Sequence, residues 1–382
     1  MKIAILTQPL KTNYGGILQA YALQTILHKA GHHVIVINRR YYWGGGTKWT
    51  IANLFIRFGS FIKTLVRKYL LRQNGYILIS PFSPYYHSRM NEQDPLPFVN
   101  KYIHQSPDIR TSEKLNKYFK RQDFNAFVVG SDQVWRPCYS PCITDFFLKE
   151  IPSQPKTIKI SYAASFGTDV WEFSNDDTEC CAELAKKFDS ISVREYSGIR
   201  LCKEYLGVDA KHVLDPTMLL DKDDYIRLFK KANVSNSSGN LFCYVLDENP
   251  HVGLIISALE KEGYIPFSAS LDPIKHNVSV EQWLRAFYDA KVVVTDSFHA
   301  CVFSILFGKP FIVVRNEGRG TARLDSLLEM FNLSYCVVDS YDDFLHRKDK
   351  LCNSFDVDEV KKELHEWRDK SLAFLRTAGI IS

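Results

Sequence analysis

The sequence is short of several features that define common protein classes. It has no run of eighteen apolar residues, so we expect no membrane-spanning helix. Its nine cysteines are scattered without a CxxC…CxxC spacing, which argues against a zinc site and a disulfide framework and favours reduced thiols in a cytoplasmic protein. No long Lys/Arg block occurs and the net charge is only +5, so nucleic-acid binding is not expected. The GxGxxG dinucleotide fingerprint is absent, and the first residues, MKIAILTQ, predict a strand rather than a signal peptide.

The composition is that of an ordinary soluble globular protein, with 46% hydrophobic and 24% charged residues. A chain of 382 residues is long enough for two domains with separate cores. Short apolar runs, typical of buried parallel strands, alternate with helical segments. These strands are predicted at residues 3–7, 34–38, 126–129, 158–163, 190–193, 213–215, 241–246, 292–294, 310–314 and 335–338. The repeated βα units predict an α/β fold with two Rossmann-like, doubly wound parallel-sheet domains that face each other across a cleft.

A polar stretch separates the two sets of strands and ends in Ser235–Gly239, a run of small and polar residues. We therefore expect an N-terminal domain over residues 1–220 and a C-terminal domain over residues 221–350. Residues 351–382 are expected to form a closing helix that packs back onto the N-terminal domain.

Two regions interrupt this regular pattern. Residues 51–70 have apolar side chains at helical spacing, and basic side chains occupy the other face. Such a helix either packs on its own domain, the commoner outcome, or makes peripheral contact with an anionic membrane. Residues 80–108 contain five prolines and predict a long surface insertion of the kind that often borders a site.

The strongest functional signal lies in residues 291–314. Residues 292–294 predict a buried strand, and Asp296 and Ser297 predict the start of the helix that follows it. His299 is therefore expected in the first helical turn, just beyond the carboxyl end of a strand. Ligands of α/β proteins bind there, and a helix start favours anions. An imidazole at this place indicates acid–base chemistry on a negatively charged small molecule, although a packed or capping histidine is the alternative.

A second cluster follows the first predicted strand. Asn13, Tyr14, Gly15 and Gly16 precede a helix that carries Gln19 on one face. Paired glycines allow a ligand to approach the backbone N–H groups of a helix start. A tight turn with no binding role is the alternative interpretation.

Two more clusters also follow predicted strands. Ser131, Asp132, Gln133 and Trp135 leave one strand together, and an aromatic ring beside an acid and an amide is a common way to hold a sugar. Arg194 leaves another strand, and its guanidinium group suits a phosphate or a carboxylate. A surface ion pair with the neighbouring glutamate is the alternative.

Three arginines follow the strand at 310–314 and precede the next predicted helix. They are Arg315, Arg319 and Arg323. Together they suggest an anion clamp, whereas each one alone is equally consistent with a role in solubility.

Five motifs occur in order along the chain. They read N-Y-G-G-x-L-Q-A-Y-A-L-Q from Asn13, V-G-S-D-Q-V-W from Val129, S-V-R-E from Ser192, L-D-P-T from Leu214 and T-D-S-F-H-A from Thr295. This series resembles the polysaccharide pyruvyl transferase family. The resemblance implies a GT-B-like fold, like that of the two-Rossmann-domain glycosyltransferases. It also implies transfer of a pyruvyl group from phosphoenolpyruvate to two hydroxyls of a sugar, giving a ketal and phosphate. Members typically modify precursors of cell-wall or capsular polysaccharide.

The resemblance also implies roles for particular residues. The family's histidine matches His299 as the acid–base group, and its V-R-E arginine matches Arg194 as an anchor for the donor's phosphate or carboxylate. Several members have an arginine where this chain has Ser297. We expect one of three later arginines to compensate, namely Arg315, Arg319 or Arg323. The donor side, which includes Asp296 and Ser297, would lie in the C-terminal domain.

The acceptor side is expected in the N-terminal domain. It would be lined by Asn13, Tyr14, Gly15, Gly16, Gln19, Ser131, Asp132 and Trp135. The expected acceptor is a sugar or a lipid-linked oligosaccharide, and no metal or redox cofactor is needed. Two alternatives stay open: a glycosyltransferase that uses UDP- or GDP-sugars, and a non-catalytic carbohydrate-binding or assembly protein.

Overall fold

The computed structural model describes residues 1–41, 95–151, 157–268, 278–315, 321–353 and 355–382, together with seven helical residues between 58 and 69. Most of the predicted helix at 51–70 and the first part of the predicted insertion at 80–108 lie outside the described residues. The later part of the insertion is not an exposed loop, because Leu96–Tyr102 form helix α4. Phe98 is buried there and its ring contacts Tyr21 edge-on.

The first sheet has six parallel strands in the order β2-β1-β3-β4-β5-β6. They are β1 (Lys2–Leu6), β2 (His33–Ile37), β3 (Ala126–Val129), β4 (Ile158–Ala164), β5 (Ser190–Val193) and β6 (Lys211–His212). Its helices are α1 (Tyr14–Lys29), α4, α5 (Ser112–Lys120), α6 (Asn175–Ala185) and α7 (Tyr196–Leu201). Ile3 and Ile5 of β1 belong to one apolar cluster, and Ala4 and Leu6 to another. The sheet is thus buried on both faces, which explains why its strands are continuous apolar runs in the sequence.

The second sheet has five parallel strands in the order β11-β10-β9-β7-β8. They are β7 (Leu241–Tyr244), β8 (Pro266–Ser268), β9 (Val292–Thr295), β10 (Phe311–Val314) and β11 (Val337–Val338). Its helices are α8 (Lys222–Lys231), α9 (Pro250–Glu260), α10 (Val280–Asp289), α11 (Phe298–Phe307), α12 (Ala322–Met330) and α13 (Tyr341–Asn353). Val293 faces the cluster shared with α10 and α11, and Val294 faces the cluster shared with α9 and α13.

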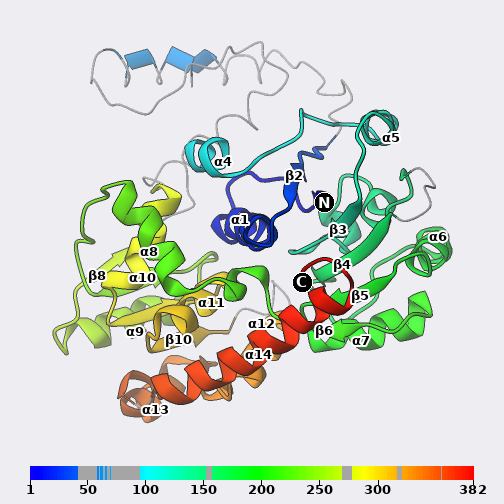
Figure 1. Cartoon of the computed structure of the whole chain (residues 1–382). Helices are drawn as coiled ribbons and strands as arrows, with labels where there is room; N and C mark the ends of the chain where they lie inside the picture. Colours follow the sequence, from blue (N-terminus) through cyan, green and yellow to red (C-terminus); the bar gives the residue numbers. More distant parts are fainter. Residues whose placement is uncertain are drawn as a thin grey trace.

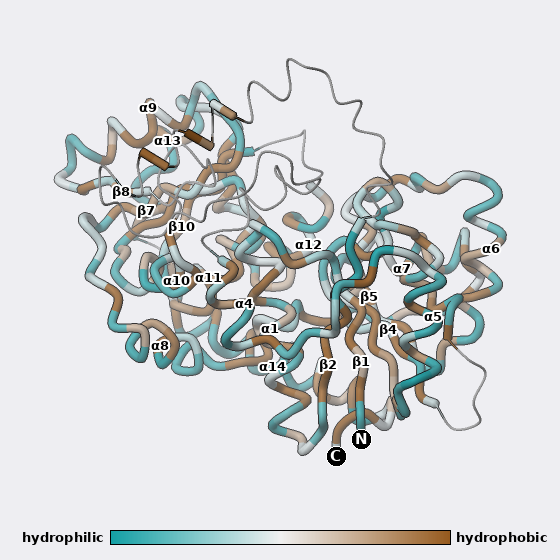
Figure 2. Tube along the Cα trace, turned by 90° about the horizontal axis from the view of Figure 1, so that it is seen from above, coloured by the Kyte–Doolittle hydropathy of each residue, from teal (hydrophilic) through white to brown (hydrophobic). Residues whose placement is uncertain are grey.

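The two sheets lie side by side, and α1 of the first is next to α10 and α11 of the second (Figures 1 and 2). One apolar cluster runs through both halves, from Ile3 to Phe311. At its centre the Tyr14 ring stacks on Trp283 of α10, with centroids 5.4 Å apart, and the Tyr14 hydroxyl donates to the Val278 carbonyl at 2.7 Å. The predicted architecture of two doubly wound parallel-sheet domains facing each other is therefore confirmed.

The long helix α14 (Val357–Thr377) crosses from the second half to the first (Figure 1). Its Ser371 hydroxyl accepts a hydrogen bond from Leu214 N at 3.0 Å, and Arg368 donates to the carbonyls of Met218 and Leu220. These contacts fix the segment that leads from β6 into a short 3₁₀ helix, Pro216–Leu219. The exact domain boundaries near residues 220 and 350 stay predictions.

Candidate active site

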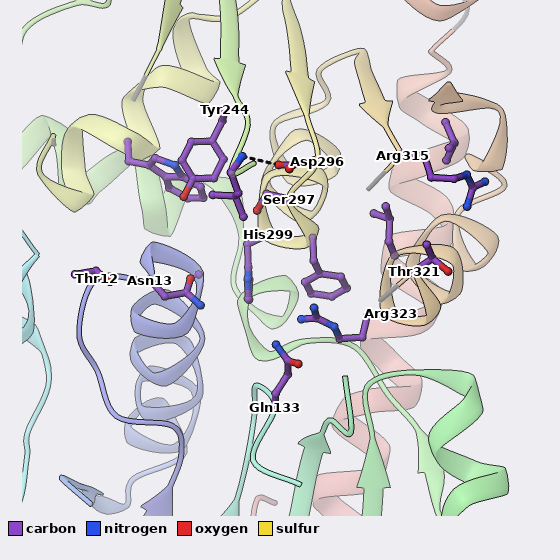
Figure 3. Close-up of a pocket in the computed structure, with 16 residues that line it drawn as sticks. Thr12, Asn13, Gln133, Tyr244, Asp296, Ser297, His299, Arg315, Thr321 and Arg323 are labelled. Carbon is purple, nitrogen blue, oxygen red and sulfur yellow. Dashed lines mark hydrogen bonds between the residues drawn. The ribbon is translucent and has the colours of Figure 1, made fainter. Parts of the chain in front are cut away.

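A cavity of about 290 Å³ opens between the start of α1 and the start of α11. Its lining comes from both halves: Thr12, Asn13, Gly15 and Gln133 from the first, and Tyr244, Leu246, Trp283, Asp296, Ser297, Phe298, His299, Arg315, Thr321, Arg323, Leu324 and Val337 from the second. Figure 3 shows His299 pointing from α11 toward α1, with Asn13 on one side and Gln133 and Arg323 on the other.

His299 lies in the first turn of α11, as predicted. The strand β9 ends at Thr295, whose hydroxyl accepts a hydrogen bond from Ser297 N at 3.0 Å and shapes the turn into the helix. Every residue of α11 is buried, so the helix and its first turn are held by packing on all sides. A Cβ atom built on Gly15 of α1 would lie 2.0 Å from His299 Nδ1. The imidazole therefore packs directly against a glycine of the opposite half.

Asp215 is the acidic partner of this histidine. Its Oδ2 lies 3.6 Å from His299 Nε2 and accepts a hydrogen bond from Arg194 Nη1 at 2.7 Å. Its Oδ1 accepts from Thr217 N and Thr217 Oγ1. Burial raises the pKa of this carboxyl, but His299 and Arg194 lower it by more, and the net pKa is well below its usual value. Asp215 is thus ionised at neutral pH and faces the imidazole as an anion.

Arg194 connects two acidic side chains behind the cavity. Besides its ion pair with Asp215, its Nη2 lies 3.3 Å from Asp132 Oδ1, and its guanidinium group lies 4.6 Å from the centre of the Phe298 ring. Burial lowers its pKa, but the charges of Asp215 and Asp132 more than reverse this, so the group stays charged. Because Phe298 lines the cavity and Arg194 lies beyond it, the predicted direct contact between Arg194 and the donor stays a prediction.

Arg323 and Arg315 both line the cavity, but their surroundings differ. Arg315 Nε lies 2.6 Å from Asp339 Oδ1, and its side chain is partly exposed. The guanidinium group of Arg323 lies 5.9 Å from the centre of the Phe298 ring. The pKa of Arg323 is lowered to about 10, mainly by burial and to a smaller extent by the charge of Arg194. Arg319, the third predicted arginine, lies outside the described residues.

Asp296 and Ser297 both line the cavity, but only one of them is the N-cap residue. Ser297 holds that position in α11, with no capping hydrogen bond from its side chain. Asp296 instead accepts hydrogen bonds from the backbone N–H groups of Leu246 at 2.8 Å and Asp247 at 3.2 Å (Figure 3). The prediction that Asp296 caps the helix is wrong, because its carboxylate is used to hold the loop after β7.

The predicted acceptor residues of α1 divide into two groups. Asn13 caps the helix by accepting from Gly16 N at 3.2 Å, and both Asn13 and Gly15 reach the cavity. Tyr14 is buried in its stack between the two halves. Gln19 is fully buried. Its Nε2 donates a hydrogen bond to Thr7 Oγ1, and its Oε1 accepts one from the backbone N–H of Ser131. Internal partners enclose the side chains of Tyr14 and Gln19, neither residue lines the cavity, and their contact with a sugar stays a prediction.

The cluster after β3 also differs from the prediction. Trp135 is fully buried, stacks on Phe147 and donates from Nε1 to the Phe146 carbonyl at 3.1 Å. Ser131 is likewise buried, and its hydroxyl donates to a backbone carbonyl of β4. Neither side chain reaches the cavity in this structure, and their contact with a sugar stays a prediction. Asp132 is placed beside Gly16 and Arg194, on the inner side of the site.

Three residues near the cavity belong to the sequence motifs but were given no role in the predicted site. Gln133 lines the cavity, and its backbone carbonyl accepts from Gln8 Nε2 at 2.7 Å. Asp215 belongs to the L-D-P-T motif, which was the available signal. Glu195 is fully buried, and its Oε1 accepts from the backbone N–H groups of Phe166 and Gly167. Burial raises the pKa of Glu195, although Arg194 and Arg323 act in the opposite direction.

The described residues contain no group of three or more His, Cys, Asp or Glu side chains placed to hold a metal ion. Nor does any helix among them have the length and apolar character needed to cross a bilayer.

The architecture and the site define a two-domain α/β protein of the GT-B-like class. Its structure is similar to a putative UDP-N-acetylglucosamine 2-epimerase from Listeria monocytogenes, with TM-score 0.53, 8% identity, and coverage of 98% of this chain and 96% of that one. It is also similar to the UDP-GlcNAc 2-epimerase from Neisseria meningitidis bound to UDP-GlcNAc, with TM-score 0.52, 10% identity, and coverage of 99% and 100%. At such identities the likeness shows the fold alone. No curated protein sequence matches the chain.

The family is shown by sequence. Residues 13–318 match the polysaccharide pyruvyl transferase family, and this range contains all five motifs. The chain belongs to the polysaccharide pyruvyl transferase family.

Proposed function

We propose that this protein transfers the pyruvyl group of phosphoenolpyruvate to two hydroxyls of a sugar, in the cytoplasm, during synthesis of a cell-surface polysaccharide precursor. The products would be a pyruvate ketal and inorganic phosphate. Membership of the family supports a transferase in general. The donor and the ketal chemistry are the proposal, and the arrangement of the cavity supports them.

The observation that carries the proposal is the His299–Asp215 pair at the edge of the cavity. An enol phosphate reacts as a ketal precursor only after a proton reaches its methylene carbon, so the site needs a proton donor. His299 is the group we assign to this step, because the buried Asp215 carboxylate lies 3.6 Å from its Nε2 and can offset positive charge that develops on the ring. The pair also orients the ring, because Gly15 limits the imidazole from its other side.

The second requirement is a cationic site for the phosphate and carboxylate of the donor. The start of α11 supplies the positive end of a ten-residue helix at the cavity wall. Arg323 and Arg315 add two guanidinium groups on the same wall. This set takes the place of the arginine that several family members have where this chain has Ser297.

In the proposed reaction, His299 protonates C3 of phosphoenolpyruvate and C2 becomes an oxocarbenium-like electrophile. A sugar hydroxyl adds to C2 and loses its proton to the neutral imidazole, which restores the acid. The C2–O bond to phosphate then breaks, and phosphate leaves with its bonding electron pair while Arg323 offsets its charge. The second hydroxyl then attacks C2 and closes the ketal ring, and its proton passes to the released phosphate, which departs as hydrogen phosphate.

The acceptor would enter beside the first half, where Thr12, Asn13 and Gln133 present polar groups to the cavity. Figure 3 shows His299 between Asn13 and Arg323, so we expect the sugar to bind beside the donor, with the imidazole between them.

The first test is thermal stabilisation of the purified chain by phosphoenolpyruvate and by a panel of UDP- and GDP-sugars. We expect stabilisation by phosphoenolpyruvate alone, and phosphate release when a sugar acceptor is added. His299→Ala should keep the donor-induced shift and lose phosphate release by at least about 100-fold. Stabilisation only by a nucleotide sugar would instead identify a glycosyltransferase and overturn the proposal.

A further inference from the structure

The N-terminal part of the chain has a charge balance unlike the rest. Residues 1–91 contain twelve Lys and Arg but no Asp or Glu, whereas residues 92–382 contain 36 basic and 43 acidic side chains. The modest overall charge of +5 therefore conceals a strongly basic segment joined to an acidic remainder. Such separation favours contact between the basic segment and a negatively charged surface.

Within this basic part, the structure describes seven residues between 58 and 69, all with helical backbone. Five of them are large apolar residues with exposed side chains, and they recur at spacings of three and four, the period of one helix face. They are Phe58 (37% exposed), Ile62 (57%), Leu65 (37%), Val66 (40%) and Tyr69 (62%). We call these five residues the apolar face.

The helical residues between 58 and 69, which carry the apolar face, lie at the edge of the molecule, beyond α4 (Figure 1). Its exposure is unusual, because large side chains elsewhere in the described chain are mostly in the three apolar clusters. An exposed apolar face of this size is typical of a surface that binds something.

The sequence around the apolar face gives the chemistry of the partner. Arg57, Lys63, Arg67 and Lys68 alternate with its residues, and no acidic residue occurs among them. Apolar side chains on one face, combined with cations and no anions, match a surface that is apolar inside and anionic outside. A bilayer containing anionic lipids has this character, and interfacial helices bind it in this way.

We propose that the apolar face binds the surface of an anionic lipid bilayer and holds the protein there as a peripheral membrane protein. No helix among the described residues has the length and apolar character to cross a bilayer, and the contact that we propose is interfacial. The proposal does not depend on pyruvyl transfer, because lipid binding requires neither donor nor acceptor. If the acceptor is lipid-linked, the same contact raises its concentration at the site.

The test is sedimentation of the full chain with vesicles of phosphatidylcholine, with or without phosphatidylglycerol. We expect binding to the vesicles that contain phosphatidylglycerol, weak binding to phosphatidylcholine alone, and release when NaCl rises from about 0.05 to about 0.5 M. Absence of binding to the anionic vesicles would overturn the proposal.

Two pairs of variants identify the surface. Ile62→Ser with Leu65→Ser should reduce the partition coefficient at least about tenfold, whereas Leu254→Ser with Leu345→Ser, two exposed leucines on α9 and α13, should leave it unchanged. Arg67→Gln with Lys68→Gln should also reduce it about tenfold or more.

The matched charge control is Lys203→Gln with Lys361→Gln, which removes two exposed cations from the acidic remainder of the chain and should have little effect. Equal losses in a test pair and its control would contradict the proposal. A second result would also contradict it. If the protein does not bind vesicles but forms a dimer in sedimentation equilibrium, and Ile62→Ser with Leu65→Ser dissociates that dimer, the apolar face binds a second copy of the chain. Melting curves of all variants report whether the fold is intact.

Discussion

His299 Nε2 lies 3.6 Å from Asp215 Oδ2, although the two residues belong to different halves of the molecule. Asp215 follows β6 of the first sheet, and His299 follows β9 of the second. The histidine that we propose as the proton donor and the carboxylate beside it therefore come together only when the two halves are docked. Activity and domain docking should consequently change together.

Asp215→Asn should abolish most activity and destabilise the fold. The substitution removes the anion beside His299 and leaves Arg194 buried with Asp132 as its remaining acidic partner, which costs roughly 3–5 kcal/mol for a buried pair. Chemical denaturation measures the loss, and phosphate release is assayed below the melting temperature. Asp221→Asn is the matched control, because its ion pair with Arg368 is exposed and contributes at most about 1 kcal/mol. Similar destabilisation of both variants would contradict the role given to Asp215.

Gly15→Ala should reduce activity by about 100-fold or more, since a Cβ at this position would lie 2.0 Å from His299 Nδ1 and must displace the ring. Steady-state phosphate release measures the effect. Gly253→Ala is the control: it is also a helical glycine, but its Cβ would meet nothing within 4 Å, so activity should be unchanged. A Gly15→Ala enzyme with normal turnover would show that the position of the imidazole is not critical.

Arg323→Met should weaken phosphoenolpyruvate binding by about tenfold or more, because the buried guanidinium group lies near Arg194 and an incoming anion relieves this repulsion. Arg315→Met should have a smaller effect, since Asp339 already compensates the Arg315 charge. Titration calorimetry compares the two. Donor affinity should also fall as the pH rises through about 10, the pKa of Arg323, where the group loses its charge. Equal losses of donor affinity in Arg323→Met and Arg315→Met would contradict the assignment of Arg323 as the main anion-binding arginine.

Glu195→Gln should change how stability depends on pH. Burial raises the pKa of Glu195 in the folded protein above its ordinary value of 4.5, so folding favours the protonated form. This contribution is fully present below pH 4.5 and is lost as the pH rises through the folded-state pKa. Glutamine keeps an oxygen for the Phe166 and Gly167 N–H groups but does not ionise. The variant should therefore gain stability relative to the wild type above that pH, measured by melting curves. Parallel pH profiles would refute this.

The fold and the position of His299 could be predicted because they depend on local patterns. Buried strands such as Val292–Thr295 are continuous apolar runs, and a turn and a helix start follow directly in the sequence. Asp215 was not singled out because its importance depends on His299 and Arg194, which come from distant segments. The local sequence around Asp215 indicates the end of a strand, but it does not show which side chains from other segments contact the carboxylate.

Trp135 shows the limit of the same reasoning. A tryptophan just after a strand has the same sequence signature whether it faces a cleft or a core. Here Phe147 and Phe166 form an apolar pocket for the ring, and the Phe146 carbonyl accepts its N–H group. Whether the ring faces a cleft or a core depends on tertiary packing, and the spacing of apolar residues along the sequence does not reveal that packing.

The contact of α14 with Leu214 has a consequence for how the protein is made. The Ser371 hydroxyl that holds Leu214 N is synthesised 157 residues later, and the neighbouring Asp215 faces His299. A nascent chain can form most of the first sheet while still attached to the ribosome, but the segment carrying Asp215 lacks its support until Ser371 has emerged. We therefore expect the segment that carries Asp215 to reach its final position only after both sheets have been synthesised.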